Sequence, residues 1–294
     1  MPEWSPEIVV DEVLARRLLA EQFPDLEPGE LRLAGEGWDN TSWLVGDQWL
    51  FRFPRREIAL DGVRRELAVL PLLAPLLPLP IPRPVHVGAP SELFPWPFFG
   101  SPAIPGRELA EARLDDRARL DLARPLAAFL RTLHTAELDV ELPIDPLGRA
   151  EMGFRVRLAR ERLAELGWAP PGAEDVFQTA LTLPPPERLA IVHGDLHLRH
   201  AFVADGRLSG VIDWGDVCRA DPAVDLVLLW CALPPDGRRD FVAAYGDVPE
   251  DALVRARVLS IFLCAVLAIH ARHVGLEHVE RESLTGLERT LAEA

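Results

Sequence analysis

The stretch IVHGDLHLRH, residues 191–200, gathers side chains that can do chemistry. Within eight residues it contains three histidines and one aspartate: His193, Asp195, His197 and His200. Imidazole and carboxylate groups in this density can form a transition-metal cluster. They can also form a loop that positions a substrate hydroxyl and divalent cations for phosphate transfer. Each interpretation requires different residues elsewhere in the chain.

A second acidic segment, LSGVIDWGD, begins eight residues after His200 and places Asp213 18 residues after Asp195. The intervening DGR predicts a tight turn, so the two apolar flanks are expected to pair as a hairpin. The hairpin would bring Asp195, His200 and Asp213 together. One carboxylate to orient a hydroxyl and two ligands for Mg²⁺ are what phosphate transfer requires.

The periodicity of the chain predicts two parts. Before residue 100, helical spacing over 11–23 and 57–76 alternates with short strands, three of them as a meander over 31–54. The second helix is expected to end at its prolines. After Gly106, helical segments dominate, with Pro125 as a local irregularity in the one over 116–136. We therefore expect an α+β fold with a small antiparallel-sheet part, residues 1–103, and a larger helical part, residues 104–294.

Composition narrows the class of protein. The net charge of −15 disfavours nucleic acid as a partner and would suit a cationic small molecule, although it can also serve solubility alone. No apolar run reaches the roughly 20 residues of a membrane-spanning helix, and the first residues lack a signal core. We expect a cytoplasmic protein without a membrane segment. Cys218, Cys231 and Cys264 form no CxxC motif and are expected to be buried, reduced thiols.

The ordered motifs resemble those of the aminoglycoside phosphotransferase family, which includes macrolide and other small-molecule kinases and has a protein-kinase-like fold. That family carries H-G-D-x-x-x-x-N followed by I-D-W or I-D-F, which read here as HGDLHLRH and IDW. The resemblance implies that Asp195 is the catalytic aspartate and that Asp213 binds magnesium. His200 stands where the family usually has Asn, and its nitrogen suits Mg²⁺ less well than an oxygen would. It is expected either to bind metal or to contact Asp195 or phosphate.

A kinase also needs a cation on a strand and a carboxylate on a helix to hold it. Arg52 and Glu66 fit this order, with a surface salt bridge as the alternative interpretation and Arg64 or Arg65 as other cations. The family often has Lys at this strand position, and this chain contains no lysine. An arginine presents its charge as a planar fork instead of a point.

The resemblance further assigns a nucleotide-binding turn and a link between the lobes. Gly35 and Gly37 would cover the phosphates, unless they only form a hairpin turn. Adenine or guanine would bond the carbonyl of Pro102 and the N–H of Ile104. The aromatic side chains nearby are expected to belong to the core: Trp96, Phe98 and Phe99.

Supporting roles are expected for residues around the loop. His193 would support the loop backbone, and Asp225 would accept hydrogen bonds from it, as the resemblance implies. Asp221 would cap the following helix. His197 and Arg199 either touch phosphate or substrate, or only pack. His270 and His273 are expected to be ordinary residues of a late helix.

We therefore predict a small-molecule kinase that uses Mg²⁺ and ATP or GTP to phosphorylate a hydroxyl of an aminoglycoside, a macrolide or a metabolic alcohol. A metal-dependent hydrolase using the histidine cluster is one alternative. An inactive nucleotide-binding pseudokinase is the other, suggested by His200 and Arg52. The sequence leaves open the acceptor, the choice between ATP and GTP, and the oligomeric state.

Overall fold

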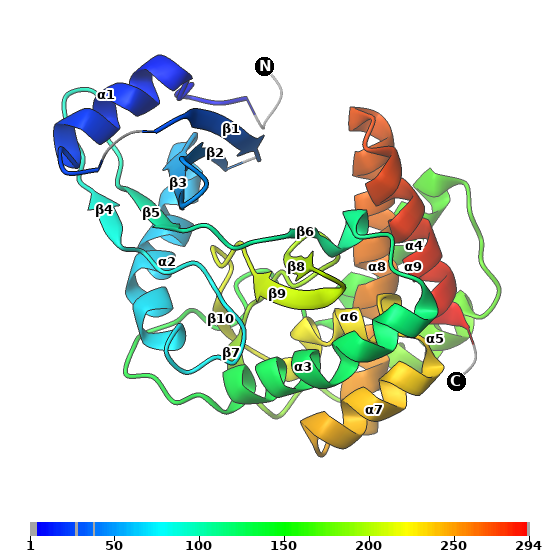
Figure 1. The fold of residues 1–294 in the computed structure, drawn as a ribbon. Coiled ribbons are helices and arrows are strands. Elements are labelled where there is room, and N and C mark those ends of the chain that lie inside the picture. The colour runs from blue at the N-terminus through cyan, green and yellow to red at the C-terminus, as the bar shows by residue number, and fades with distance from the viewer. Residues whose placement is uncertain (1–4, 27–28, 38, 293–294) are drawn as a thin grey trace. The chain divides into compact units, whose positions relative to one another are not determined.

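The computed structural model describes residues 5–26, 29–37 and 39–292. The chain divides into two compact units (Figure 1). Unit 1 contains Met1–Pro75 and Ile81–Ile104, and unit 2 contains Leu76–Pro80 and Pro105–Ala294. The division near Ile104 lies one residue from the predicted boundary, but the return of 76–80 to unit 2 was not predicted.

Unit 1 is built on an antiparallel sheet with strand order β1-β2-β3-β5-β4. The first three strands form the predicted meander. Helix α1 begins at the N-cap Asp11, whose carboxylate accepts the N–H of Leu14 at 2.8 Å. The elements are α1 Glu12–Gln22, β1 Leu31–Glu36, β2 Asn40–Val45, β3 Trp49–Pro54, the 3₁₀ turn η1 Glu57–Ala59, α2 Leu60–Leu73, β4 His86–Gly88 and β5 Phe98–Pro102.

Aromatic side chains form the core of unit 1. Phe51, Phe53 and Phe98 are fully buried, and the rings of Phe53 and Phe98 stack with centroids 4.6 Å apart. The expectation that Phe98 and Phe99 belong to the core is confirmed, and Trp96 is partly buried against the same cluster. This packing fixes strand β3, which carries Arg52.

The second helix ends between its two prolines. Pro71 lies inside α2, which continues to Leu73 and ends before Pro75. Only one backbone hydrogen bond is lost at Pro71, and Leu70 and Leu73 on either side of it are completely buried. Apolar burial at the end of the helix therefore outweighs the missing bond.

Unit 2 is mainly helical, with two small sheets of order β10-β7 and β6-β8-β9. Helix α3 passes through Pro125 without a break and begins at the N-cap Asp115. The elements are β6 Arg107–Glu108, the 3₁₀ turn η2 Leu109–Glu111, α3 Asp116–Thr135, α4 Met152–Leu166, α5 Ala173–Leu181, β7 Ala190–Val192, β8 Ala201–Ala204, β9 Arg207–Val211, β10 Cys218–Ala220, the 3₁₀ turn η3 Pro222–Asp225, α6 Val227–Cys231, α7 Pro235–Tyr245, α8 Glu250–Val274 and α9 Glu277–Leu291.

The β8–β9 hairpin forms where the sequence predicts it. Its two-residue turn consists of Asp205 and Gly206, with φ of +50° and +73°. Positive φ at both turn positions matches the twist of the paired strands. The hairpin places His200 directly before β8 and Asp213 shortly after β9.

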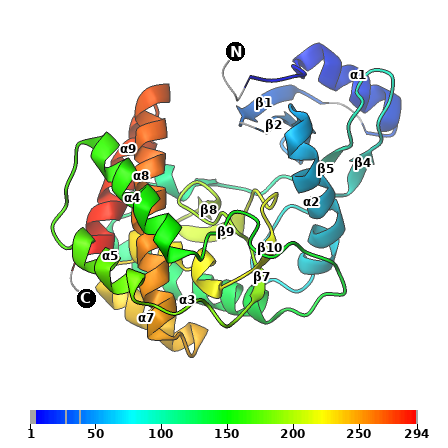
Figure 2. The same ribbon diagram turned by 180° about the vertical axis from the view of Figure 1, so that it is seen from behind.

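Helix α8 is long and apolar enough to cross a membrane by length and composition, which a search for uninterrupted apolar runs missed. However, 67% of that apolar window is buried inside the protein. In Figure 2, α8 runs between α4, α5 and α9, and these helices pack against it. Its apolar composition is thus accounted for by its place in the core of unit 2. Cys218, Cys231 and Cys264 are buried free thiols, as predicted.

Candidate active site

One buried carboxylate, that of Asp225, binds the backbone of the loop between β7 and β8. Asp225 accepts the N–H of His193 at 2.7 Å and the N–H of Gly194 at 3.0 Å. Burial alone would raise the pKa of Asp225, but hydrogen bonds from His134 and Gly194 hold it below its usual value. This carboxylate therefore stays ionised and orients the two peptide groups that precede Asp195.

Gly194 is required by the loop geometry. Its φ is +88°, and a Cβ at this position would overlap the backbone carbonyl oxygen of Asp216. Only glycine satisfies both conditions without strain.

The ring of His193 supports the loop, as expected. Its Nε2–H donates to the carbonyl of Ile212 at 2.9 Å, because that carbonyl can only accept. Its Nδ1 then accepts the N–H of Asp195 at 3.2 Å. The ring also packs on Trp214 with centroids 4.7 Å apart. His193 thereby ties Asp195 to the segment that carries Asp213.

His200 presents a lone pair toward Asp213. Its Nδ1–H donates to the backbone carbonyl of Asp195 at 2.7 Å, which fixes the tautomer with a bare Nε2. This Nε2 lies 3.6 Å from Oδ2 of Asp213. Asp213 itself has φ of +65°, a conformation that costs a non-glycine residue free energy and often marks functional positions.

His197 is held in the opposite tautomer. Its Nδ1 accepts the N–H of Arg199 at 3.2 Å, so its hydrogen is on Nε2, which lies 3.7 Å from Oδ2 of Asp195. The guanidinium of Arg199 is held by both carboxylate oxygens of Glu108, at 2.8 and 2.9 Å. His197 therefore packs inside the loop next to Asp195, and the charge of Arg199 is engaged by strand β6.

The loop shifts the pKa values of its titratable groups. Burial raises the pKa of Asp195 to about 6, and the negative charges of Asp216 and Asp213 act in the same direction, while His200 opposes them. Burial lowers the pKa of His197 to about 3 and that of His200 to about 4. Both rings are thus uncharged near pH 7, and the pKa of Asp195 lies within about one unit of neutral pH.

Ligand atoms of Asp195, His197 and His200 lie within 4.8 Å of one another, close enough to surround a metal ion. The hydrogen bonds of the loop determine which histidines still have a nitrogen lone pair for a metal ion. The lone pair of His193 is used by the N–H of Asp195, and that of His197 by the N–H of Arg199. Only His200 offers a nitrogen lone pair in this cluster, so a centre with several imidazole ligands, as the hydrolase alternative requires, is disfavoured.

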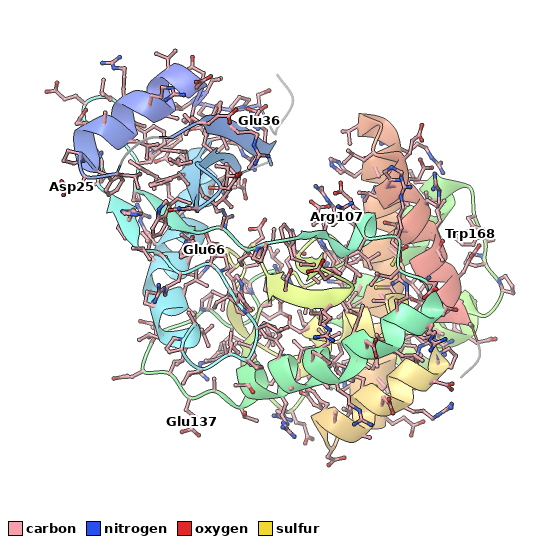
Figure 3. All side chains as sticks on the ribbon, in the orientation of Figure 1. Asp25, Glu36, Glu66, Arg107, Glu137 and Trp168 are labelled. Atoms are coloured by element: carbon pink, nitrogen blue, oxygen red, sulfur yellow. The ribbon has the colours of Figure 1, made fainter. Side chains whose placement is uncertain are left out.

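In unit 1, Arg52 on β3 and Glu66 on α2 form a buried ion pair between Nη1 and Oε1. Figure 3 labels Glu66 on its helix. The side chains are 10% and 1% exposed, so the alternative of a surface salt bridge is wrong. The arginine also lies over the ring of Phe99, 5.9 Å from its centroid. Arg64 is exposed and pairs with Asp61 on its own helix.

The predicted nucleotide-contacting backbone lies at the strand ends of unit 1. Gly35 lies at an irregularity of β1, and the N–H of Gly37 donates to the carbonyl of Asn40 at 2.9 Å. Neither glycine has positive φ; a Cβ at Gly35 would meet no atom within 4 Å, and one at Gly37 would lie 3.7 Å from the carbonyl oxygen of Asn40. The local structure therefore requires glycine at neither position. Pro102 pairs with Trp49 at the end of β5, and Ile104 follows it. The neighbouring Trp38 lies outside the described residues.

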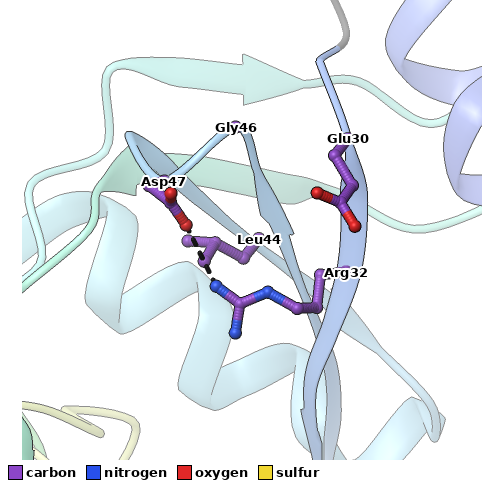
Figure 4. Close-up of a pocket in the computed structure, with 5 residues that line it drawn as sticks. All are labelled: Glu30, Arg32, Leu44, Gly46 and Asp47. Carbon is purple, nitrogen blue, oxygen red and sulfur yellow. Dashed lines mark hydrogen bonds and ion pairs between the residues drawn. The ribbon is translucent and has the colours of Figure 1, made fainter.

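One small pocket of unit 1 lies away from these residues (Figure 4). It encloses about 40 Å³ beside β1 and the β2–β3 turn, and Arg32 donates to Asp47 there at 3.0 Å. Both side chains are largely exposed. A space of roughly one water molecule with an exposed ion pair carries no chemistry.

His134 is a residue whose contacts the sequence does not reveal. Its Nε2 lies 3.1 Å from Oδ2 of Asp225, and its Nδ1 lies 2.7 Å from the hydroxyl of Tyr245. The three residues are far apart in the chain and belong to no common motif, so no local signal could have joined them. Asp221 caps η3 through the N–H of Ala223 at 2.9 Å, as predicted.

Comparisons with known proteins agree with this geometry. The model of the phosphotransferase enzyme family matches residues 30–259. An aminoglycoside 3'-phosphotransferase of Escherichia coli is 30% identical over 147 residues, and the uncharacterized protein YcbJ of Bacillus subtilis is 26% identical over 207 residues. The alignments cover 47% and 63% of this chain and span 54% and 63% of those relatives, less than two thirds of their length.

Solved structures are similar over almost the whole chain. The complex of APH(2")-IIIa with GDP and kanamycin has a TM-score of 0.71 and 25% identity, covering 95% of this chain and 98% of that one. The macrolide 2'-phosphotransferase MphH of Brachybacterium faecium has a TM-score of 0.63 and 24% identity, covering 94% and 98%. The predicted kinase-like α+β fold is thereby confirmed.

Proposed function

Because the chain belongs to the phosphotransferase enzyme family, we propose that it transfers the γ-phosphate of ATP or GTP to a hydroxyl group of a small molecule. The observation that carries this proposal is the convergence of Asp195, His200 and Asp213 on a loop whose backbone is fixed by Asp225. Phosphate transfer depends on positioning and charge neutralisation more than on covalent steps by the protein.

Asp195 is proposed to be the catalytic residue. Its carboxylate, 34% exposed, would accept a hydrogen bond from the acceptor hydroxyl and take its proton as the phosphorus–oxygen bond forms. A pKa of about 6 leaves it ionised at neutral pH and still basic enough for this step. His193 supports its position by accepting the N–H of Asp195.

Asp213 and His200 are proposed to hold the divalent cation. The carboxylate of Asp213, 46% exposed, supplies the oxygen that Mg²⁺ prefers, and the bare Nε2 of His200 adds a nitrogen donor that suits Mg²⁺ less well. A bound Mg²⁺ would neutralise charge on the nucleotide phosphates. The donated hydrogen bond from Nδ1 fixes the His200 ring for this role.

Unit 1 is proposed to bind the nucleotide. Arg52, held by Glu66, would contact phosphate oxygens, and Gly35 and Gly37 would let the backbone approach them. The carbonyl of Pro102 and the N–H of Ile104 would bond the base. Residues 1–103 would thus form the nucleotide lobe, and 104–294 the lobe with the catalytic loop and the acceptor site.

The acceptor is proposed to be a small cationic alcohol such as an aminoglycoside or a macrolide. One relative was solved with GDP and kanamycin bound, and the net charge of −15 would attract a polyamine. We place the protein in the cytoplasm, with neither nucleic acid nor a membrane as its partner.

The test is Mg²⁺-dependent phosphate transfer from ATP and from GTP to a panel of aminoglycosides, macrolides and metabolic alcohols, with Asp195→Ala as the control. Transfer that disappears in the variant supports the proposal and identifies the acceptor class. Nucleotide binding with no transfer to any acceptor would favour a pseudokinase. Absence of nucleotide binding would refute both.

A further inference from the structure

We propose that His134 and Tyr245 are positioning residues that act through Asp225 on the backbone of the catalytic loop. This inference rests on the proposed function, because it assigns them an effect on phosphate transfer. Neither residue touches the reacting groups described above. Their effect would instead be transmitted by a continuous chain of hydrogen bonds.

The chain of hydrogen bonds joins four segments of unit 2. Tyr245, the last residue of α7, lies 2.7 Å from Nδ1 of His134 on α3, and Nε2 of His134 lies 3.1 Å from Oδ2 of Asp225 in η3. Asp225 continues it to the N–H groups of His193 and Gly194 at 2.7 and 3.0 Å. Helices α3 and α7 pack along each other in both ribbon views (Figures 1 and 2).

Asp225 limits the direction of the bonds in this chain. The ionised carboxylate of Asp225 can only accept, so His134 carries its hydrogen on Nε2. Nδ1 of His134 then has a lone pair and accepts the hydroxyl hydrogen of Tyr245. In this tautomer the ring of His134 donates to Asp225 through Nε2 and accepts from Tyr245 through Nδ1, so it links the two residues.

The hydrogen bonds of this chain are buried, so the loss of one of them costs free energy. The side chains of His134 and Asp225 are 0% exposed, and Tyr245 is 6% exposed. No water can replace a missing partner without rearrangement, and a buried polar group that loses its partner is costly. Oδ2 of Asp225 is shared by His134 and by the N–H of His193, so a change in His134 alters the same oxygen that positions the loop.

A purely structural role is the competing explanation, since any buried hydrogen bond contributes to stability. The two explanations differ in what they predict for the loop. A structural role lowers the melting temperature alone. A positioning role changes hydrogen exchange at His193 and the kcat of the folded enzyme, and leaves the KM for nucleotide unchanged.

Three variants of the full chain separate these explanations. Tyr245→Phe removes only the hydroxyl. His134→Leu removes the donor to Asp225, and His134→Gln restores a neutral N–H donor near the position of Nε2. Phe241→Leu is the matched control, because Phe241 is fully buried on α7 and its ring stacks on Tyr245 with centroids 5.7 Å apart, without joining the chain of bonds.

The measurements are kcat and KM well below the melting temperature, and NMR with ¹⁵N-histidine. The label reports the ring tautomer of His134 and the exchange of the His193 amide. We expect Tyr245→Phe to lower kcat about three- to tenfold and to speed His193 exchange by a similar factor, as the loss of one neutral hydrogen bond implies. His134→Leu should have a larger effect, of about 10–100-fold, and His134→Gln should recover most of it.

Phe241→Leu should lower the melting temperature and leave kcat and His193 exchange unchanged. Wild-type kcat and exchange in both Tyr245→Phe and His134→Leu would overturn the proposal. A wild-type protein that binds nucleotide but phosphorylates no acceptor would refute the proposed function and the catalytic part of this inference. Unchanged exchange in an active protein would refute this inference alone.

Discussion

The proposed catalytic loop of unit 2, residues 193–200, and the Arg52–Glu66 pair of unit 1 use charge in opposite ways. In unit 1 two opposite charges are buried and neutralise each other, with side chains 10% and 1% exposed. In unit 2 the carboxylates of Asp195 and Asp213 are 34% and 46% exposed and have like-charged neighbours. The loop that carries Asp195 is positioned by backbone hydrogen bonds, from the N–H groups of His193 and Gly194 to Asp225 and from the N–H of Asp195 to His193.

The contrast concerns stability as much as function. A buried ion pair penalises the loss of either partner, because the remaining charge is left without compensation. A cluster of carboxylates is unfavourable until a cation binds, and removing one of them relieves repulsion. Removing a carboxylate should therefore lower stability in unit 1 and raise it in unit 2, which the first and the last of the following predictions test.

The largest effect is expected for Glu66→Ala. It deprives buried Arg52 of its carboxylate, and the expected loss is about 3–5 kcal/mol of unfolding free energy. Denaturant unfolding checks this value, with the melting temperature as a second measure. Arg52→Lys is the matched control, because it preserves the opposite charges and changes only the shape of the cation. A loss below about 1 kcal/mol in Glu66→Ala would mean that the pair contributes as little as an exposed one.

Gly194→Ala should be the next most disruptive change. The residue has φ of +88°, and its Cβ would overlap the carbonyl oxygen of Asp216. We expect a loss of about 1–3 kcal/mol together with a fall in phosphate transfer, because the displaced peptide carries Asp195. Gly206→Ala is the control, since its φ is +73° and nothing lies within 4 Å of its Cβ. Equal losses in both variants would show that the overlap is absorbed by the loop.

The arrangement of the loop residues could be predicted from the sequence, but the hydrogen bonds of His134 and Tyr245 that reach the loop through Asp225 could not. HGDLHLRH and IDW lie close together in the chain and are joined by a two-residue turn, so local rules sufficed to bring His200 and Asp213 together. His134 and Tyr245 reach Asp225 from helices 91 and 20 residues away in sequence, and only packing brings them there. A single sequence carries no signal for such contacts.

In unit 1 the meander followed from the strand pattern and the pairing of Arg52 with Glu66 from the family resemblance, whereas the extent of α2 did not follow from either. A local rule for proline predicted that the helix ends at its prolines without deciding between Pro71 and Pro75, and the burial of Leu70 and Leu73 carries it past the first of them. The tautomers of the loop histidines were likewise unpredictable, because they depend on individual hydrogen bonds. These tautomers determine whether several loop histidines or His200 alone could offer a nitrogen lone pair to a metal ion.

The third prediction concerns the metal. His200→Asn replaces a nitrogen donor with an amide oxygen, so the preference for Mn²⁺ over Mg²⁺ should fall about tenfold. Competition of Mg²⁺ against Mn²⁺, followed by electron paramagnetic resonance, measures the ratio without requiring activity. His273→Asn is the control, because His273 is exposed and its ring bonds only the backbone of its own helix. An unchanged ratio would show that His200 is not a ligand.

The smallest effect tests the stability contrast most directly. Burial raises the pKa of Asp195 to about 6 from an ordinary value of 3.8, so the folded protein favours the protonated form more than the unfolded chain does. Below about pH 4 both states are protonated and the group has no effect. As pH rises from about 4 to about 6, the unfolded chain loses this proton before the folded protein does, so stability falls, and above about pH 6 the loss is complete. Asp195→Asn should therefore match the wild type at pH 4 and melt about 2–4 °C higher at pH 8 in metal-free buffer.

Asp205→Asn at the exposed β8–β9 turn controls for the loss of one negative charge. Added Mg²⁺ should reduce the difference, because a cation stabilises the wild-type carboxylates. A variant that is less stable than the wild type at pH 8 would mean that Asp195, like Glu66, contributes to the fold, and the contrast between the two regions would be lost.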